Sequence, residues 1–91
     1  YGRIRRSQFK ALKEMGLQCV FWDCLSYDFD THLVSQDCFE ATIQSAKPGS
    51  IVVFHDSLKA QSRLKPCLPL LLDTWLEEGY SFKTLPQALQ Q

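Results

Sequence analysis

The sequence has no excess of charge of either sign. Ten lysine and arginine residues balance ten aspartate and glutamate residues, which gives a formal net charge of +0 at pH 7. Basic residues cluster at Arg3, Arg5 and Arg6, and we interpret this trio as the solvated entrance of a helix. Binding to nucleic acid or to an anionic membrane requires a more sustained basic surface. The charge pattern therefore favours neither partner.

The sequence also lacks an apolar run long enough to cross a bilayer, and it carries no signal peptide. It has no initiator methionine and opens on Tyr1 and Gly2. We therefore expect the 91 residues to be part of a longer protein, in which case the missing signal peptide leaves the localisation open. A chain of this length holds at most one small domain.

No two cysteines form a CxxC motif. The four cysteines are Cys19, Cys24, Cys38 and Cys67, which are separated by wide and irregular intervals. This spacing excludes zinc-ribbon and thioredoxin-type sites. We interpret the cysteines mainly as small buried hydrophobic residues, with disulfides as the alternative. The redox compartment stays open.

Apolar residues recur at helical spacing in two segments of the first half. A helix is predicted over about residues 8 to 15, with Ser7 as its cap and Gly16 at its end. A second helix is predicted with Ser35 as its cap, and Pro48 and Gly49 are expected to stop it. Its apolar face consists of Phe39, Thr42, Ile43 and Ala46. Their spacing of three and four residues is typical of an amphipathic helix.

A third helix is predicted in the second half, before Gly79. Its apolar stripe consists of Leu64, Leu68, Leu71, Leu72, Trp75 and Leu76. Pro66 and Pro69 are expected near its start, where missing backbone donors cost least. Pro86 is expected to open a short terminal helix. The stretch from residue 55 to residue 63 is interpreted as a loop.

Strands are predicted over residues 17–22, 51–54 and 80–85, where apolar, β-branched and aromatic residues gather. The resulting order α-β-α-β-α-β-α indicates an α/β fold in which parallel strands alternate with helices through right-handed crossovers. Three parallel strands leave bare edges. We therefore expect either further strands or pairing with a second copy, which would give a homo-oligomer.

His55 and Asp56 follow directly after the apolar run at residues 51–54. Chemistry in parallel sheets gathers at the carboxyl ends of the strands. The loop after the first predicted strand ends at the same edge and carries Asp28. A lone histidine is weak evidence for a site, so its position alone leaves a solvated strand exit as an equal alternative.

Three motifs in order resemble the second half of a polysaccharide deacetylase domain, the NodB-homology or carbohydrate esterase family 4 domain. They are "YG" (1–2), "WDCLSYDF" (22–29) and "IVVFHD" (51–56). The resemblance implies an α/β fold that forms a partial (β/α) barrel of the NodB type. It also implies that residues 1–91 are the C-terminal part of one deacetylase-like domain whose metal-binding N-terminal half is absent.

The chain departs from the family pattern at several positions. The Asp-Asp and His-x-x-x-His motifs that hold the metal have no counterpart, and the arginine and prolines that precede the family's tyrosine are missing. Phe29 stands where the family has tryptophan, Leu25 replaces an acidic residue, and Val53 replaces a pocket leucine. These changes affect the metal site and the wall of the substrate pocket.

The resemblance implies a role for five residues. His55 would be the general acid that protonates the leaving amine, and Asp28 would orient its imidazole and stabilise its charge. Tyr1 would supply a backbone N–H to the oxyanion. Phe29 and Val53 would line the pocket for the sugar and its acetyl group. For Asp56 we favour a role in bonding the loop.

The resemblance also implies the cofactor and the substrate class. The parent protein would hydrolyse N-acetyl or O-acetyl groups of a carbohydrate with a divalent metal, zinc or a similar ion. We expect no metal in this chain and no turnover by the 91 residues alone. The family is typically found in the cell envelope or outside the cell.

Two other functions stay open at this point. Asp23, after the apolar run "CVFW", is a candidate nucleophile of a phosphoaspartate-type α/β domain, although the carboxylates that would bind Mg²⁺ are missing at Cys24 and Leu25. Alternatively, the chain is a deacetylase-like interaction module without catalytic activity.

Overall fold

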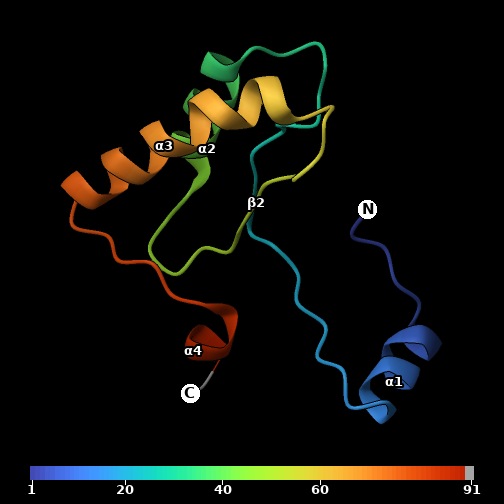
Figure 1. Cartoon of the computed structure of the whole chain (residues 1–91). Helices are drawn as coiled ribbons and strands as arrows, with labels where there is room; N and C mark the ends of the chain where they lie inside the picture. The colour runs from blue at the N-terminus through green and yellow to red at the C-terminus, as the bar shows by residue number, and fades with distance from the viewer. Residues whose placement is uncertain (90–91) are drawn as a thin grey trace.

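The structure describes residues 1–89, which form four helices and two short strands. Figure 1 shows how these elements are arranged. The structure is a computed structural model. In chain order its elements are α1 (Arg6–Glu14), β1 (Cys24–Leu25), α2 (Ser35–Ser45), β2 (Val52–Val53), α3 (Gln61–Glu77) and α4 (Leu85–Leu89).

The two strands pair in parallel. Cys24 lies opposite Val52 and Leu25 lies opposite Val53. Past the end of β1, the Ser26 N–H donates to the Val53 carbonyl at 3.3 Å. The parallel direction agrees with the alternation of strands and helices in the sequence. It places the carboxyl ends of both strands at the same edge. The partial barrel stays a prediction.

Helix α2 begins at Ser35, which was predicted to cap it; the cap is instead Val34, one residue earlier. The Asp37 carboxylate accepts the Val34 backbone N–H at 2.9 Å and satisfies one of the free donors at this helix end. Cys38 and Thr42 are the buried residues of the helix, and the Thr42 hydroxyl donates to the Cys38 carbonyl at 2.6 Å. The remaining residues of the predicted apolar face, Phe39, Ile43 and Ala46, pack around the core.

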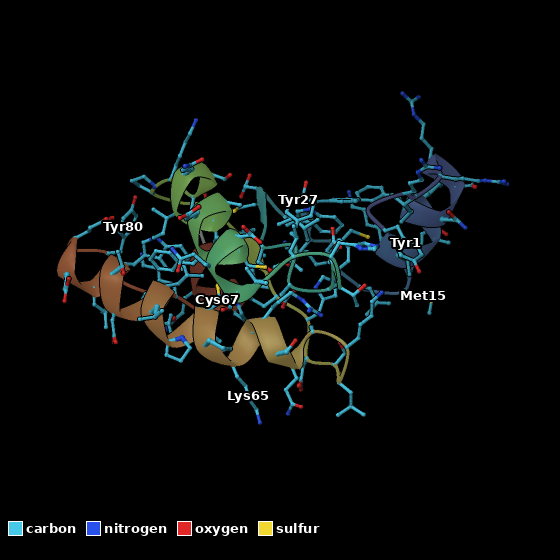
Figure 2. The ribbon with its side chains drawn as sticks, turned by 90° about the horizontal axis from the view of Figure 1, so that it is seen from above. Tyr1, Met15, Tyr27, Lys65, Cys67 and Tyr80 are labelled. Atoms are coloured by element: carbon cyan, nitrogen blue, oxygen red, sulfur yellow. The ribbon has the colours of Figure 1, made fainter. Side chains whose placement is uncertain are left out.

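Helices α2 and α3 lie side by side and enclose the core between them (Figures 1 and 2). The core consists of Cys38, Cys67, Leu71 and Trp75. Figure 2 shows Cys67 on the side of α3 that faces α2. All four cysteines are free thiols. The interpretation of Cys38 and Cys67 as small buried hydrophobic residues is confirmed.

The buried face of α3 differs from the predicted stripe. Its buried residues are spaced four apart and consist of Arg63, Cys67, Leu71 and Trp75. Leu76 was predicted to be buried but is 58% exposed. The reason is that α2 covers one narrow row of α3, while the six apolar residues of the stripe spread more widely around the helix.

Pro66 and Pro69 lie inside α3, so the prediction that they mark its first turn is wrong. The helix begins at Gln61, within the segment interpreted as a loop. Both prolines are exposed. The backbone carbonyls that lose a partner belong to Ser62 and Lys65, which are also exposed residues, so water can partly compensate for the loss.

Two predicted strands are absent from the part of the chain that the structure describes. Residues 17–22 are not a strand, and the strand of this region is β1, further along the chain. Residues 80–84 run without a strand into α4. A strand needs a partner for its backbone N–H and C=O groups, and within residues 1–89 neither segment pairs with another strand. The short helix at Pro86 is confirmed.

The N-terminal part stands apart from the paired helices (Figure 1). No residue of α1 is buried. The radius of gyration is 15.1 Å, whereas a compact domain of this length has about 12 Å. No helix within residues 1–89 combines the length and the apolar character needed to cross a bilayer.

Candidate functional site

The carboxyl ends of the two strands carry the candidate site. Asp28 lies in the loop after β1, and His55 follows β2 after one intervening residue. Because the strands are parallel and paired in register, both loops leave the sheet at the same edge. The prediction that this edge brings the two side chains together agrees with the structure.

His55 contacts the Asp28 carboxylate twice. The His55 backbone N–H donates to Asp28 Oδ2 at 2.7 Å, and His55 Nδ1 lies 2.8 Å from Asp28 Oδ1. An ionised carboxylate accepts hydrogen bonds and donates none, so the Nδ1 atom carries the proton in this contact. The ring is thereby held in one orientation, with Nε2 as the nitrogen left to meet another molecule.

Burial differs sharply between the two side chains. The side chain of Asp28 is 1% exposed, whereas that of His55 is 40% exposed. A buried carboxylate is costly unless hydrogen bonds compensate for its lost water. Here both carboxylate oxygens are engaged by His55. The imidazole of His55 is therefore open to solvent while the carboxylate that holds it is buried.

Two aromatic side chains extend from this pair along the loop after β1. The Phe29 ring lies edge-on to the His55 ring, with centroids 5.1 Å apart. The Tyr27 ring lies 5.9 Å from that of Phe29 and is 46% exposed. Tyr27 has a φ of 61°, a left-handed conformation that is uncommon for a bulky residue. Backbone outliers of this kind cluster at functional sites.

The other predicted substrate-binding residues lie further from the pair. Val53 is the last residue of β2 and is half-buried, two positions before His55. Tyr1, labelled in Figure 2, is fully exposed. Gly2, the next residue, packs against Trp22: a Cβ on Gly2 would lie 2.9 Å from the indole. The structure thus brings the "YG" motif to the start of the "WDCLSYDF" motif.

Three other acidic residues of these loops and strand ends, Asp23, Asp30 and Asp56, have local structural roles or none. Asp23 precedes β1, and its carboxylate accepts the Ile51 backbone N–H at 2.7 Å. It therefore lies at the amino end of the strand pair, which does not favour the phosphoaspartate alternative. The Asp30 carboxylate accepts the His32 backbone N–H at 2.9 Å, a local turn. Asp56 is exposed, and the carboxylate that contacts His55 is that of Asp28.

Sequence reasoning missed two polar residues at this site. The Ser26 hydroxyl, fully buried, accepts the Asp28 backbone N–H at 3.3 Å. Arg63, 7% exposed, donates from Nε to the Asp28 backbone carbonyl at 2.7 Å. A sequence signal for Arg63 exists, because it stands four residues before Cys67 in the buried row of α3. The signal was missed because this stretch was interpreted as a loop.

A donor set for a divalent metal is not found among residues 1–89. No three histidine, cysteine, aspartate or glutamate side chains of this part lie together as possible ligands. Burial, followed by the neighbouring Cys38 and Asp28, raises the pKa of the Cys67 thiol to about 11. Burial likewise raises the pKa values of Cys24 and Cys38. These thiols are protonated at neutral pH, whereas metal ligation and nucleophilic attack require the thiolate.

Comparison with known proteins points to one relative. The chain is 30% identical over 93 aligned residues to a peptidoglycan-N-acetylglucosamine deacetylase of Bacillus cereus. The match covers 98% of this chain and 42% of that protein, so the chain spans about two fifths of the length of its relative. No family model matches the chain, and no solved structure matches it significantly. Over nearly its whole length, the chain is thus similar to part of a carbohydrate deacetylase.

Proposed function

We propose that the protein containing this chain is a carbohydrate deacetylase in which His55 is the general acid. The observation that carries the proposal is the double contact of Asp28 with His55, at 2.7 and 2.8 Å. The carboxylate is buried while the imidazole is partly exposed. A positioned imidazole with one free nitrogen is suited to proton transfer near neutral pH.

The proposed reaction is the hydrolysis of an N-acetyl amide. Water adds to the carbonyl carbon, the C–N bond breaks, and acetate and a free amine leave. The amine is a poor leaving group unless it gains a proton, and His55 Nε2 donates that proton in this proposal. Asp28 holds Nδ1 and offsets the positive charge of the protonated ring, so the ring does not have to reorient during the reaction.

The substrate class is proposed from the printed function of the relative and from the residues beside His55. Phe29 offers an aromatic wall next to the imidazole, and aromatic faces suit the apolar faces of sugar rings. Val53 would contact the acetyl group, and Tyr1 would reach the oxyanion once the N-terminal segment is held in place. The proposed substrate is therefore an N-acetylated carbohydrate.

The remaining parts of the proposal concern a longer protein. The extended shape supports it, because the radius of gyration of 15.1 Å exceeds that of a compact domain. An open apolar hollow beside β2, bordered by Trp22, Val53 and Trp75, points the same way. We propose that further strands complete a (β/α) barrel here. A divalent metal, which would polarise the acetyl carbonyl, would be bound by residues other than those described, and no step is derived through it.

Acetate release tests the proposal. The full-length protein is incubated with oligomers of N-acetylglucosamine, and acetate and free amine are both measured. We expect equal amounts of the two products, and a fall in kcat of about 100-fold or more in His55→Ala, with KM little changed. The proposal is wrong if the full-length protein binds the oligomers without releasing acetate, or if His55→Ala keeps most of its rate. Binding without release would favour the interaction module.

A further inference from the structure

Arg63 is a buried cation at the start of α3. It is 7% exposed and takes the first position of the row that continues through Cys67, Leu71 and Trp75 into the core. Burying a guanidinium is costly unless its donors are satisfied. Within residues 1–89, the recorded ion pairs include none with Arg63. Its donors must therefore find other partners.

Those partners are oxygens that carry no full charge. Nε donates to the Asp28 backbone carbonyl at 2.7 Å. One terminal nitrogen donates to the Lys59 backbone carbonyl, and the other donates to the Ser62 hydroxyl at 3.2 Å. Because Arg63 uses the backbone carbonyl of Asp28, both carboxylate oxygens stay with His55.

The two carbonyls belong to the two loops of the candidate site. Asp28 lies in the loop after β1, and Lys59 lies in the loop that leads from His55 to α3. A single guanidinium therefore ties both loops to the first turn of α3. The planar group has donors in fixed directions, so it holds the loops at one separation.

We propose that Arg63 is a positioning residue for the pair formed by His55 and Asp28. It acts through Asp28, whose backbone it fixes, and it does not touch the substrate. The expected effect of Arg63 on turnover rests on the proposed function. Its expected effect on the hydrogen bond between His55 and Asp28 does not. A lysine at this position keeps the charge but lacks donors directed at three acceptors at once.

The test compares Arg63→Lys with Lys65→Gln in the full-length protein. Lys65 is an exposed cation in the same helix, so its variant controls for the replacement of a basic residue of α3 that contacts neither loop. The first readout is the NMR signal of the His55 Nδ1 proton and its exchange with water. The second is the split between kcat and KM in acetate release, and a thermal melt reports whether each variant is folded.

We expect Arg63→Lys to fold, to exchange the Nδ1 proton faster, and to lose about 10-fold in kcat with little change in KM. Lys65→Gln should match the unmodified protein in all three measurements. The inference is overturned if folded Arg63→Lys keeps both the slow exchange and the kcat. Lys65→Gln matching Arg63→Lys in both losses would also overturn it.

A second variant covers the case in which Arg63→Lys does not fold. Arg63→Gln keeps an amide that can donate to one of the two carbonyls, so it no longer ties the two loops together. Faster Nδ1 exchange in folded Arg63→Gln supports the inference, and unchanged exchange rejects it. The two proposals fail separately. Without acetate release from any preparation, a faster exchange in Arg63→Lys still supports positioning while the deacetylase proposal fails.

Discussion

Asp28 gives both of its carboxylate oxygens to His55, one to the backbone N–H and one to the imidazole. The first contact fixes the path of the backbone after β2, and the second fixes the orientation of the imidazole ring. Backbone and side chain of His55 are therefore positioned by the same buried anion. Loss of this anion should affect the chemistry more than the binding of a carbohydrate.

Asp28→Asn should lower kcat about 100-fold or more and leave KM little changed. An amide has one oxygen to accept hydrogen bonds, so it cannot serve both donors of His55. Acetate release by the full-length protein measures the effect. Asp56→Asn is the matched control, because Asp56 is an exposed neighbour of His55 and should tolerate the change. Equal losses in the two variants would contradict the assignment of Asp28.

Tyr27→Asn should raise the free energy of unfolding by about 1 kcal/mol, because a left-handed backbone costs roughly 1–2 kcal/mol for most residues and less for asparagine. The φ of Tyr27 is 61°. Urea unfolding measures the change. Phe21→Asn is the control, since Phe21 has similar exposure and is not among the residues with positive φ. A loss of stability in Tyr27→Asn would show that the ring contact with Phe29 outweighs the backbone strain.

Stability should fall as the pH rises from about 9 to about 11, in part because of Cys67. Burial raises the pKa of this thiol from 9.0 to about 11. Above pH 9 the unfolded chain releases the proton while the folded chain keeps it, so the equilibrium shifts toward unfolding. Two pH units at about 1.4 kcal/mol each give an upper limit of about 3 kcal/mol.

Urea unfolding at several pH values measures this loss. Cys67→Ala should be less stable at pH 8, because it leaves a small cavity in the core. Its stability should nevertheless fall less steeply between pH 9 and pH 11. Contributions from all other groups are common to the two proteins, and the comparison of slopes removes them. Parallel slopes in the two proteins would contradict the role of Cys67.

Pro69→Ala should stabilise α3 by about 1 to 3 kcal/mol, because it restores a backbone hydrogen bond inside the helix. The greater freedom of alanine in the unfolded chain reduces the gain. Thermal melting measures it. Pro86→Ala is the matched control: Pro86 lies in the first turn of α4, where no intrahelical N–H bond is lost. A gain of the same size in both variants would rule out the restored hydrogen bond as the cause.

Local patterns in the sequence predicted those elements whose stability depends on their own residues. Helix α2 has an amphipathic spacing and an acidic residue in its first turn, and it begins within one residue of the predicted start. The apolar run at 51–54 contains β2, although the strand is shorter. The meeting of His55 with Asp28 follows from two parallel strands that end at one edge. These features could be predicted from the sequence alone.

The errors come from features that depend on distant partners. Residues 17–22 have the composition of a strand, but strand formation requires a neighbouring backbone. The start of α3 was missed because Arg63 stands in a polar stretch. Its burial becomes favourable only when the carbonyls of Asp28 and Lys59 meet it in the folded chain. The sequence around Arg63 does not indicate that these two carbonyls will bind it in the folded chain.

The geometry of the candidate site depends on how α3 is rotated about its own axis, because one buried row of this helix serves both the core and the site. At one end of the row Trp75 packs in the core, and at the other end Arg63 binds the loops that carry Asp28 and Lys59. One residue inserted between them would turn the guanidinium by about 100° around the helix axis, since a turn takes 3.6 residues. An insertion or deletion between Arg63 and Trp75 would therefore move the guanidinium away from the loops even if Trp75 stayed in the core. The stretch from 81 to 84 lies outside any helix or strand and should tolerate such changes better.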